Sequence, residues 1–280
     1  MIVDSTDGVE LAVHDLGGHG RSLLISHATG FHGHCYEPIA HALADRFHSI
    51  AFDYRGHGDT DRPAGPVDWA KYGDDAFAMA TWLHERDGGP IDAFGHSMGG
   101  ACLLMAALRG PHLFRRLVVF EPIVFPPNPE RDALSDDQNP MVMGARRRRA
   151  TFPTYQAAID NYSAKPPLNS FTPDAMRAYV LHGFALDDEG VHLKCRPETE
   201  AETFSMGPRH DTWDHLPEIA TDTLVMAGRV DAGQPSMIAS MVAERLPTAR
   251  YQQFDDLDHF GPMARPLLVA DAIAQSLTRP

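Results

Sequence analysis

The chain has 280 residues, of which 43% are hydrophobic and 22% charged, a composition typical of globular proteins. Its formal net charge of −14 disfavours binding to nucleic acid or anionic lipid. The sequence contains no apolar run of the ~18 residues that a membrane span needs, and no signal peptide is visible. Three widely separated cysteines form neither a disulfide framework nor a metal-binding pair, so we expect a cytoplasmic protein.

Short apolar runs alternate along the chain with longer segments of helical periodicity. Strands are expected at Val9–His14, Ser22–Ser26, His48–Asp53, Ile91–Phe94, Arg116–Phe120, Thr223–Ala227 and Ala249–Phe254. Helices are expected near Tyr36–Arg46, Tyr72–Glu85, Met98–Leu108, Pro235–Arg245 and Arg265–Leu277. Strands that are separated by helices require crossover connections, which predicts an α/β fold with a mainly parallel sheet flanked by helices.

The segment Phe125–Leu216 interrupts this alternation. It opens with several prolines, shows no clear buried strand and contains short helical patterns, two of them with expected N-caps at Thr154 and Thr172. We therefore expect residues 125–216 to form a helical cap, inserted in a core made of residues 1–124 and 217–280.

The cap segment is rich in aromatic and methionine side chains. They either line a substrate pocket or form the cap's own core, and the sequence leaves both open. Tyr155, Phe184 and Trp213 are the first candidates for pocket residues.

The strongest indication of chemistry is Gly95-His96-Ser97-Met98-Gly99, placed between an expected strand and an expected helix. In that context G-x-S-x-G forms a turn so tight that the flanking positions tolerate no Cβ, and the serine Oγ is held exposed beside a helix N-terminus. An ordinary glycine-rich turn is the less favoured alternative. We predict that Ser97 is a nucleophile.

A serine hydroxyl needs a base, and His259 is the best candidate. It lies in a loop between the last expected strand and the last expected helix, so it leaves the sheet at the edge where Ser97 also lies. Sixteen histidines make any single one weak evidence by itself, and a surface-loop histidine is the alternative.

The acid that orients the histidine is ambiguous. Asp231 follows the expected strand Thr223–Ala227, and Glu121 follows the expected strand Arg116–Phe120. Either carboxylate would lie at the same edge of the sheet and could hold the imidazole in the correct tautomer. We favour Asp231, with Glu121 as the alternative.

Two other clusters invite a functional interpretation. His27, His32 and His34 with Cys35 suggest a metal site, but their spacing fits a loop better, and we expect no metal and no cofactor. The run Arg146–Arg149 would wrap all round a helix, so we expect it to be mostly solvated and paired with carboxylates; binding of an anionic substrate group is the less favoured alternative.

Five motifs in order make the chain resemble the α/β-hydrolase fold superfamily over essentially its whole length. They are Ser26–Phe31 as the oxyanion loop, with Ala28 where glycine is usual; the turn Asp53–Thr60; the nucleophile elbow Gly95–Gly99; the acid turn Gly228–Asp231; and the histidine loop Asp258–Phe260, with Asp258 in place of glycine. Some members of the superfamily, including cap-bearing lactonases, carry the acid after the strand before the cap, which keeps Glu121 open.

The resemblance also implies an oxyanion hole formed by the backbone N–H groups of Met98 and Thr29. Gly30 and Phe31 belong to the same loop, and Phe31 could shape the floor of the pocket.

The predicted activity is therefore a serine hydrolase that acts on a small-molecule carboxylic ester or lactone through an acyl-enzyme. A C–C bond hydrolase or a perhydrolase would use the same residues, and a non-catalytic ligand-binding protein of this fold is the alternative from another class. The oligomeric state stays open.

Overall fold

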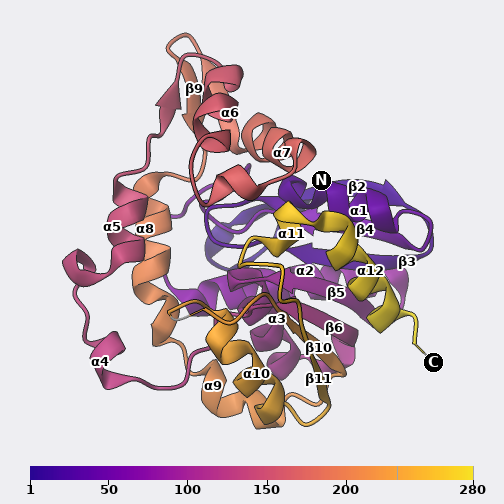
Figure 1. The fold of residues 1–280 in the computed structure, drawn as a ribbon. Coiled ribbons are helices and arrows are strands. Elements are labelled where there is room, and N and C mark those ends of the chain that lie inside the picture. The colour runs from indigo at the N-terminus through magenta and orange to yellow at the C-terminus, as the bar shows by residue number, and fades with distance from the viewer. Residues whose placement is uncertain (232, 280) are drawn as a thin grey trace.

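The computed structural model describes residues 1–231 and 233–279 and centres on an eight-stranded sheet (Figure 1). The strand order is β1-β2-β4-β3-β5-β6-β10-β11. The bounds are β1 Ile2–Asp4, β2 Glu10–Gly18, β3 Arg21–Ser26, β4 Phe47–Phe52, β5 Ile91–His96, β6 Phe114–Phe120, β10 Thr223–Ala227 and β11 Ala249–Gln253. The β1–β2 and β2–β4 pairs are antiparallel and the remaining pairs are parallel.

Helices cover both faces of this sheet (Figure 1). Helices α1 (Glu37–Leu43) and α12 (Pro266–Leu277) pack on one face. Helices α2 (Trp69–Asp87), α3 (Met98–Arg109) and α10 (Ser236–Arg245) pack on the other. Two apolar cores result, one on each side, and strands between them are apolar without alternation because both of their faces are covered. The prediction of an α/β fold with a mainly parallel sheet is confirmed.

The expected elements of the core agree with the structure to within a few residues at each end. The short edge strand β1 was not expected. Its three residues pair with Glu10–Ala12 of β2, but only Val3 among them is buried, so β1 leaves too little apolar pattern to be seen in the sequence.

The inserted segment contains helices and, contrary to expectation, a small sheet. Its helices are α4 Pro129–Asp132, α5 Pro140–Arg146, α6 Tyr155–Ser163, α7 Pro173–Gly183, α8 Pro197–Met206 and α9 Thr212–His215. The sheet has the order β7-β9-β8, with β7 Thr151–Phe152, β8 Phe184–Asp187 and β9 Gly190–Leu193. Its strands are short and partly polar, which explains why no buried strand was expected there. The predicted N-caps are confirmed, since Thr154 and Thr172 accept hydrogen bonds from the N–H groups of Ala157 and Ala175.

The helices of the segment form two groups in Figure 1, α5 beside α8 and α6 beside α7, the second group close to the small sheet. The end of the segment packs differently. Helix α9 and the 3-10 turn Leu216–Glu218 lie against α3 and α10, and Trp213 belongs to the core on that side of the large sheet. Trp213 is therefore not a pocket residue.

Within the part of the chain that the structure describes, no helix is both long enough and apolar enough to cross a membrane.

Candidate active site

Ser97 lies in a strained turn between β5 and α3. Its φ of 57° and ψ of −117° are unusual for a residue with a side chain. A Cβ on Gly95 would lie 2.7 Å from Gly100 Cα, and a Cβ on Gly99 would lie 2.2 Å from the carbonyl oxygen of Ser26. Backbone on both sides therefore forces glycine at these two positions, as the motif predicts, and the turn presents Ser97 at the carboxyl edge of the sheet.

His259 meets Ser97 as expected. The histidine lies in the loop between β11 and α11 (Gly261–Ala264), and its Nε2 is 3.1 Å from Ser97 Oγ. The hydroxyl of Ser97 donates to this nitrogen, so the other ring nitrogen carries the proton. This is the geometry that a general base needs in order to activate a serine.

Glu121 accepts a hydrogen bond from the other ring nitrogen of His259, Nδ1. Nδ1–H of His259 donates to Glu121 Oε2 at 2.6 Å, and the N–H of Gly228 donates to Glu121 Oε1 at 2.8 Å. The side chain is completely buried. Glu121 follows the last residue of β6 with a positive φ of 45°, a backbone conformation that turns the chain sharply at this point. Both carboxylate oxygens thus have a donor, and the orientation of the imidazole is defined.

Asp231 does not reach the histidine, so the preference for it as the orienting acid is wrong in geometry. Its carboxylate is about half exposed and pairs with Arg229 at 3.0 Å. The expected acid turn nevertheless contributes backbone donors to the site. Gly228 supplies the N–H that holds Glu121, and the N–H of Arg229 donates to the carbonyl of Leu257, the residue directly before the histidine loop Asp258–Phe260.

The expected oxyanion loop lies beside the N-terminus of α3. Thr29 Oγ1 donates to Met98 Sδ at 3.5 Å, so the two residues whose N–H groups are candidate donors are in contact. Among the hydrogen bonds of the described residues, neither of these two N–H groups is used. Ala28, which replaces the usual glycine, is accommodated: it is buried, and its carbonyl accepts from Phe31 N–H and from the His27 ring.

A chain of hydrogen bonds that sequence reasoning missed connects this loop to His259. The N–H of Ala28 donates to the Tyr36 hydroxyl (3.1 Å), which donates to Nδ1 of His96 (2.9 Å). Nε2–H of His96 then donates to the carbonyl of His259 (2.8 Å). Burial and the nearby ring of His259 hold the pKa of His96 well below its usual range, so this ring stays neutral. The sequence held a signal for this chain of hydrogen bonds, because His96 directly precedes Ser97 in the elbow motif.

Aromatic side chains from the core and from the inserted segment meet next to His259. Phe31 contacts His96, Phe171, Tyr179 and Phe260 with ring centroids 5.4 to 6.2 Å apart. That Phe31 shapes the floor of a pocket stays a prediction. Phe184 instead packs on Phe152 and Tyr162 inside the cap.

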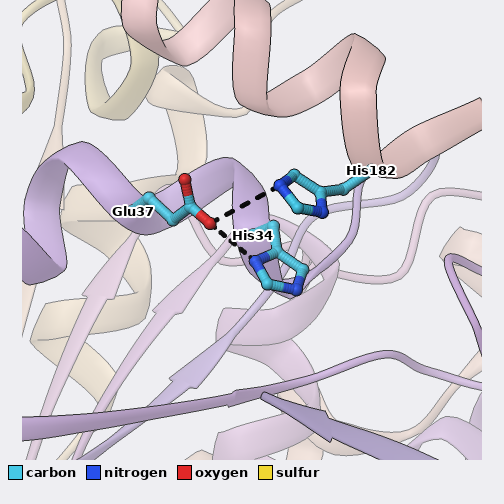
Figure 2. A group of neighbouring side chains, drawn as sticks. All are labelled: His34, Glu37 and His182. Carbon is cyan, nitrogen blue, oxygen red and sulfur yellow. Dashed lines mark hydrogen bonds and ion pairs between the residues drawn. The ribbon is translucent and has the colours of Figure 1, made fainter. Parts of the chain in front are cut away.

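The histidine-rich loop is engaged in protein contacts. His27 uses both ring nitrogens, one towards the carbonyl of Ala28 and one towards the N–H of Tyr54, and burial lowers its pKa to about 3. Figure 2 shows His34 and His182 beside Glu37. The two rings are stacked, 3.9 Å apart and only 12° from parallel. A metal ion must lie in the plane of each ring that binds it, so these two imidazoles do not converge on one ion as they stand.

The run Arg146–Arg149 divides in the structure. Arg146, Arg147 and Arg149 are exposed, as expected for a solvated run. Arg148 is not: its side chain is 14% exposed and pairs with Glu200 of α8 at 2.8 Å. The expectation was too coarse here, because Arg148 lies after the end of α5 and also packs over the rings of Tyr162 and Tyr179.

The fold and the three linked side chains define one class of protein, the α/β-hydrolase-fold class. The chain belongs to the alpha/beta hydrolase family, whose profile matches residues 23–272, so the resemblance is confirmed. A curated relative, 2-(acetamidomethylene)succinate hydrolase of Mesorhizobium japonicum, is 26% identical over 211 residues, 75% of this chain and 71% of the relative.

Solved structures agree on the fold. That of an E-2-(acetamidomethylene)succinate hydrolase superposes with a TM-score of 0.79 at 23% identity, covering 100% of this chain and 98% of the other. That of the enol-lactonase from Burkholderia xenovorans has a TM-score of 0.73 at 20% identity and covers 100% of both chains.

Proposed function

We propose that this protein is a serine hydrolase that cleaves a small-molecule carboxylic ester or lactone through an acyl-enzyme. The observation that carries the proposal is the continuous hydrogen-bonded chain from Ser97 Oγ through His259 to Glu121. Serine, histidine and a buried carboxylate in this order are the parts that acyl transfer requires.

Each residue has a definite step. Nε2 of His259 takes the proton of Ser97 as Oγ attacks the carbonyl carbon. The carboxylate of Glu121 accepts the hydrogen bond of Nδ1 and stabilises the imidazolium that forms. His259 then donates the proton to the departing alkoxide oxygen, which leaves the acyl group on Ser97. In the second half, His259 removes a proton from water as the water oxygen bonds to the acyl carbon. The bond from that carbon to Ser97 Oγ then breaks, His259 returns the proton to Oγ, and the free acid leaves.

The negative charge of the tetrahedral intermediate requires preorganised donors. The unused N–H groups of Met98 and Thr29 are the candidates, the first at a helix N-terminus where the helix dipole favours negative charge. Phe31, Phe171, Tyr179 and Phe260 supply apolar surface next to the reacting atoms, which suits a moderately apolar portion of the substrate.

The relatives support hydrolysis as the reaction, but they do not agree on the type of bond that is cleaved. The Mesorhizobium protein is named for a substituted succinate, the Burkholderia protein for an enol-lactone. Hydrolysis of a C–C bond and perhydrolysis use the same triad, and they are alternatives to be tested with the same enzyme.

A fluorophosphonate probe tests the proposal. We expect one equivalent to label Ser97, and Ser97→Ala to lose both labelling and turnover of a panel of simple esters while keeping its melting temperature. Arg147→Gln, a change at an exposed cap residue, is the control and should label at the wild-type rate. Labelling without turnover of any ester or lactone would favour another bond type, and absence of labelling would reject the serine mechanism.

A further inference from the structure

The ion pair between Arg148 and Glu200 lies beside two tyrosine rings of the cap. Arg148 Nη1 donates to Glu200 Oε2 at 2.8 Å, and Nε donates to the hydroxyl of Tyr162 at 3.2 Å. The guanidinium carbon also lies 5.3 Å and 5.6 Å from the ring centroids of Tyr162 and Tyr179. Burial disfavours the charge of Arg148, but Glu200 outweighs it and raises the arginine pKa, so the group stays cationic.

Two donors at this ion pair have no hydrogen-bond partner among the residues that the structure describes. Arg148 Nη2 and the Tyr179 hydroxyl are both buried and, within the described residues, accept and donate no hydrogen bond. A buried donor left unpaired costs free energy, so such atoms call for a reason. An ion pair with a purely structural role would be more stable if both donors had acceptors. Arg148 Nη2 and the Tyr179 hydroxyl can each donate a hydrogen bond to an anionic oxygen.

These groups lie beside the expected oxyanion loop. A Cβ on Gly30 would be 2.4 Å from Glu200 Oε1 and 3.4 Å from Arg148 Nη1, so the pair packs directly on the residue after Thr29. Tyr179 contacts Phe31 with centroids 5.4 Å apart. The backbone of Gly30 thus separates the carbonyl-binding side of the loop from the ion pair by a single residue.

We propose that Arg148 and Tyr179 bind a carboxylate on the acyl portion of the substrate, which makes the substrate a half-ester or lactone of a dicarboxylic acid. This rests on the proposed function. Nη2 of the guanidinium and the Tyr179 hydroxyl each donate to a carboxylate oxygen, while Glu200 holds Nη1 and keeps the planar group in place. The leaving group must face His259, which delivers its proton, so the acyl portion is the part that extends towards the Thr29–Gly30 side.

The test compares two substrates that differ in one charge: 4-nitrophenyl hydrogen glutarate and its neutral methyl ester, methyl 4-nitrophenyl glutarate. We expect wild type to have the higher kcat/KM for the half-ester. Arg148→Gln should lower the ratio of the two kcat/KM values about 10–100-fold, the range that a hydrogen bond to a charged group contributes. Tyr179→Phe should lower it less. Arg147→Gln, its exposed neighbour, is the matched control and should leave the ratio unchanged.

A second variant guards against misfolding. Arg148→Gln leaves Glu200 buried without its partner, so Arg148→Gln/Glu200→Gln removes both charges together. The same fall in ratio is expected for the double variant. A wild-type enzyme without preference for the half-ester, or variants that lower both kcat/KM values equally, would overturn the proposal.

Binding without turnover separates this proposal from the one before it. Glutarate titrated into Ser97→Ala by calorimetry measures the subsite alone. We expect binding that is lost in Ser97→Ala/Arg148→Gln and kept in Ser97→Ala/Arg147→Gln. If no ester is hydrolysed but glutarate binds in this pattern, the subsite stands and the hydrolase proposal fails. If esters are hydrolysed and glutarate does not bind, the subsite proposal fails.

Discussion

Glu121 and His259 are 138 positions apart in the chain, yet their side chains meet at 2.6 Å, with the second oxygen of Glu121 held by the N–H of Gly228. The carboxylate comes from the end of a central strand, and the imidazole from a loop that follows the edge strand β11. The strand order β6-β10-β11 brings the two ends together with the β10 turn between them.

The triad acid can be decided with two isosteric changes. Glu121→Gln should reduce kcat by about 10³–10⁴-fold, because both the imidazole tautomer and the stabilisation of the imidazolium are lost. Asp231→Asn should have little effect, since that exposed carboxylate pairs with Arg229. Steady-state kinetics with one good ester measures both. A crippled Asp231→Asn with a nearly normal Glu121→Gln would mean that the site rearranges before it reacts.

Tyr36 is expected to act as a positioning residue through His96. Tyr36→Phe removes the donor to His96 Nδ1 and the acceptor of the Ala28 N–H, so it disturbs both the oxyanion loop and the histidine loop. We expect kcat to fall by up to about 100-fold, the cost of a small misplacement of reacting groups, with a smaller change in KM. Tyr72→Phe, which removes a buried hydroxyl bonded to Thr203 elsewhere, is the control for stability effects. Equal losses in the two variants would show that Tyr36 is only structural.

The side chain of Phe171, and not that of Phe184, should limit the length of the acyl chain that the site accepts. Phe171 lies against Phe31 and Phe260, whereas Phe184 is in the interior of the cap. Phe171→Ala should shift the ranking of esters towards longer acyl chains, in steps of about 1–3 kcal/mol per methylene at most. Phe184→Ala should lower the free energy of unfolding by about 3–5 kcal/mol and keep the ranking. An unchanged ranking in a folded Phe171→Ala would place the size filter elsewhere.

Alanine at Gly99 of the elbow should lower the free energy of unfolding, whereas alanine at Gly144 of the cap should raise it. In Gly99→Ala the new Cβ would meet the Ser26 carbonyl oxygen at 2.2 Å, so we expect a loss of about 1–3 kcal/mol or more of stability, together with loss of activity. In Gly144→Ala, within α5, nothing lies within 4 Å, and the better helix former should add about 0.5–1 kcal/mol. Urea unfolding checks both, and a tolerated Gly99→Ala would contradict the close backbone approach.

Stability should fall as the pH is lowered from about 6.5 towards 4. Burial lowers the pKa of His27 and of His32 from 6.5 to about 3, so both rings are neutral in the folded protein. The unfolded chain binds protons first as the pH falls, which means that their contribution is complete above pH 6.5 and is lost progressively towards pH 3. Urea unfolding at pH 8, 6, 5 and 4 measures the slope. A flat free energy of unfolding across this range would show that these histidines are protonated in the folded state.

The sequence by itself determined the strand and helix order of the core, and it was enough to select Ser97 and His259 as candidate nucleophile and candidate base. These depend on local rules: alternation of apolar runs, and a turn so tight that Gly95 and Gly99 cannot carry a Cβ. The choice of acid was not local. Asp231 and Glu121 both follow strands that end at the same edge of the sheet. The positive φ of Glu121 and the N–H of Gly228 place the Glu121 carboxylate against the imidazole of His259. Asp231 instead pairs with Arg229 in solvent.

The cap shows the same division. Four consecutive arginines have one local pattern, and nothing in it distinguishes Arg148 from its neighbours. Tertiary packing decides: α8 brings Glu200 to Arg148, while α6 and α7 bring the rings of Tyr162 and Tyr179. A buried charge is stable only where tertiary structure supplies a partner, so its position cannot be predicted from neighbours in the sequence.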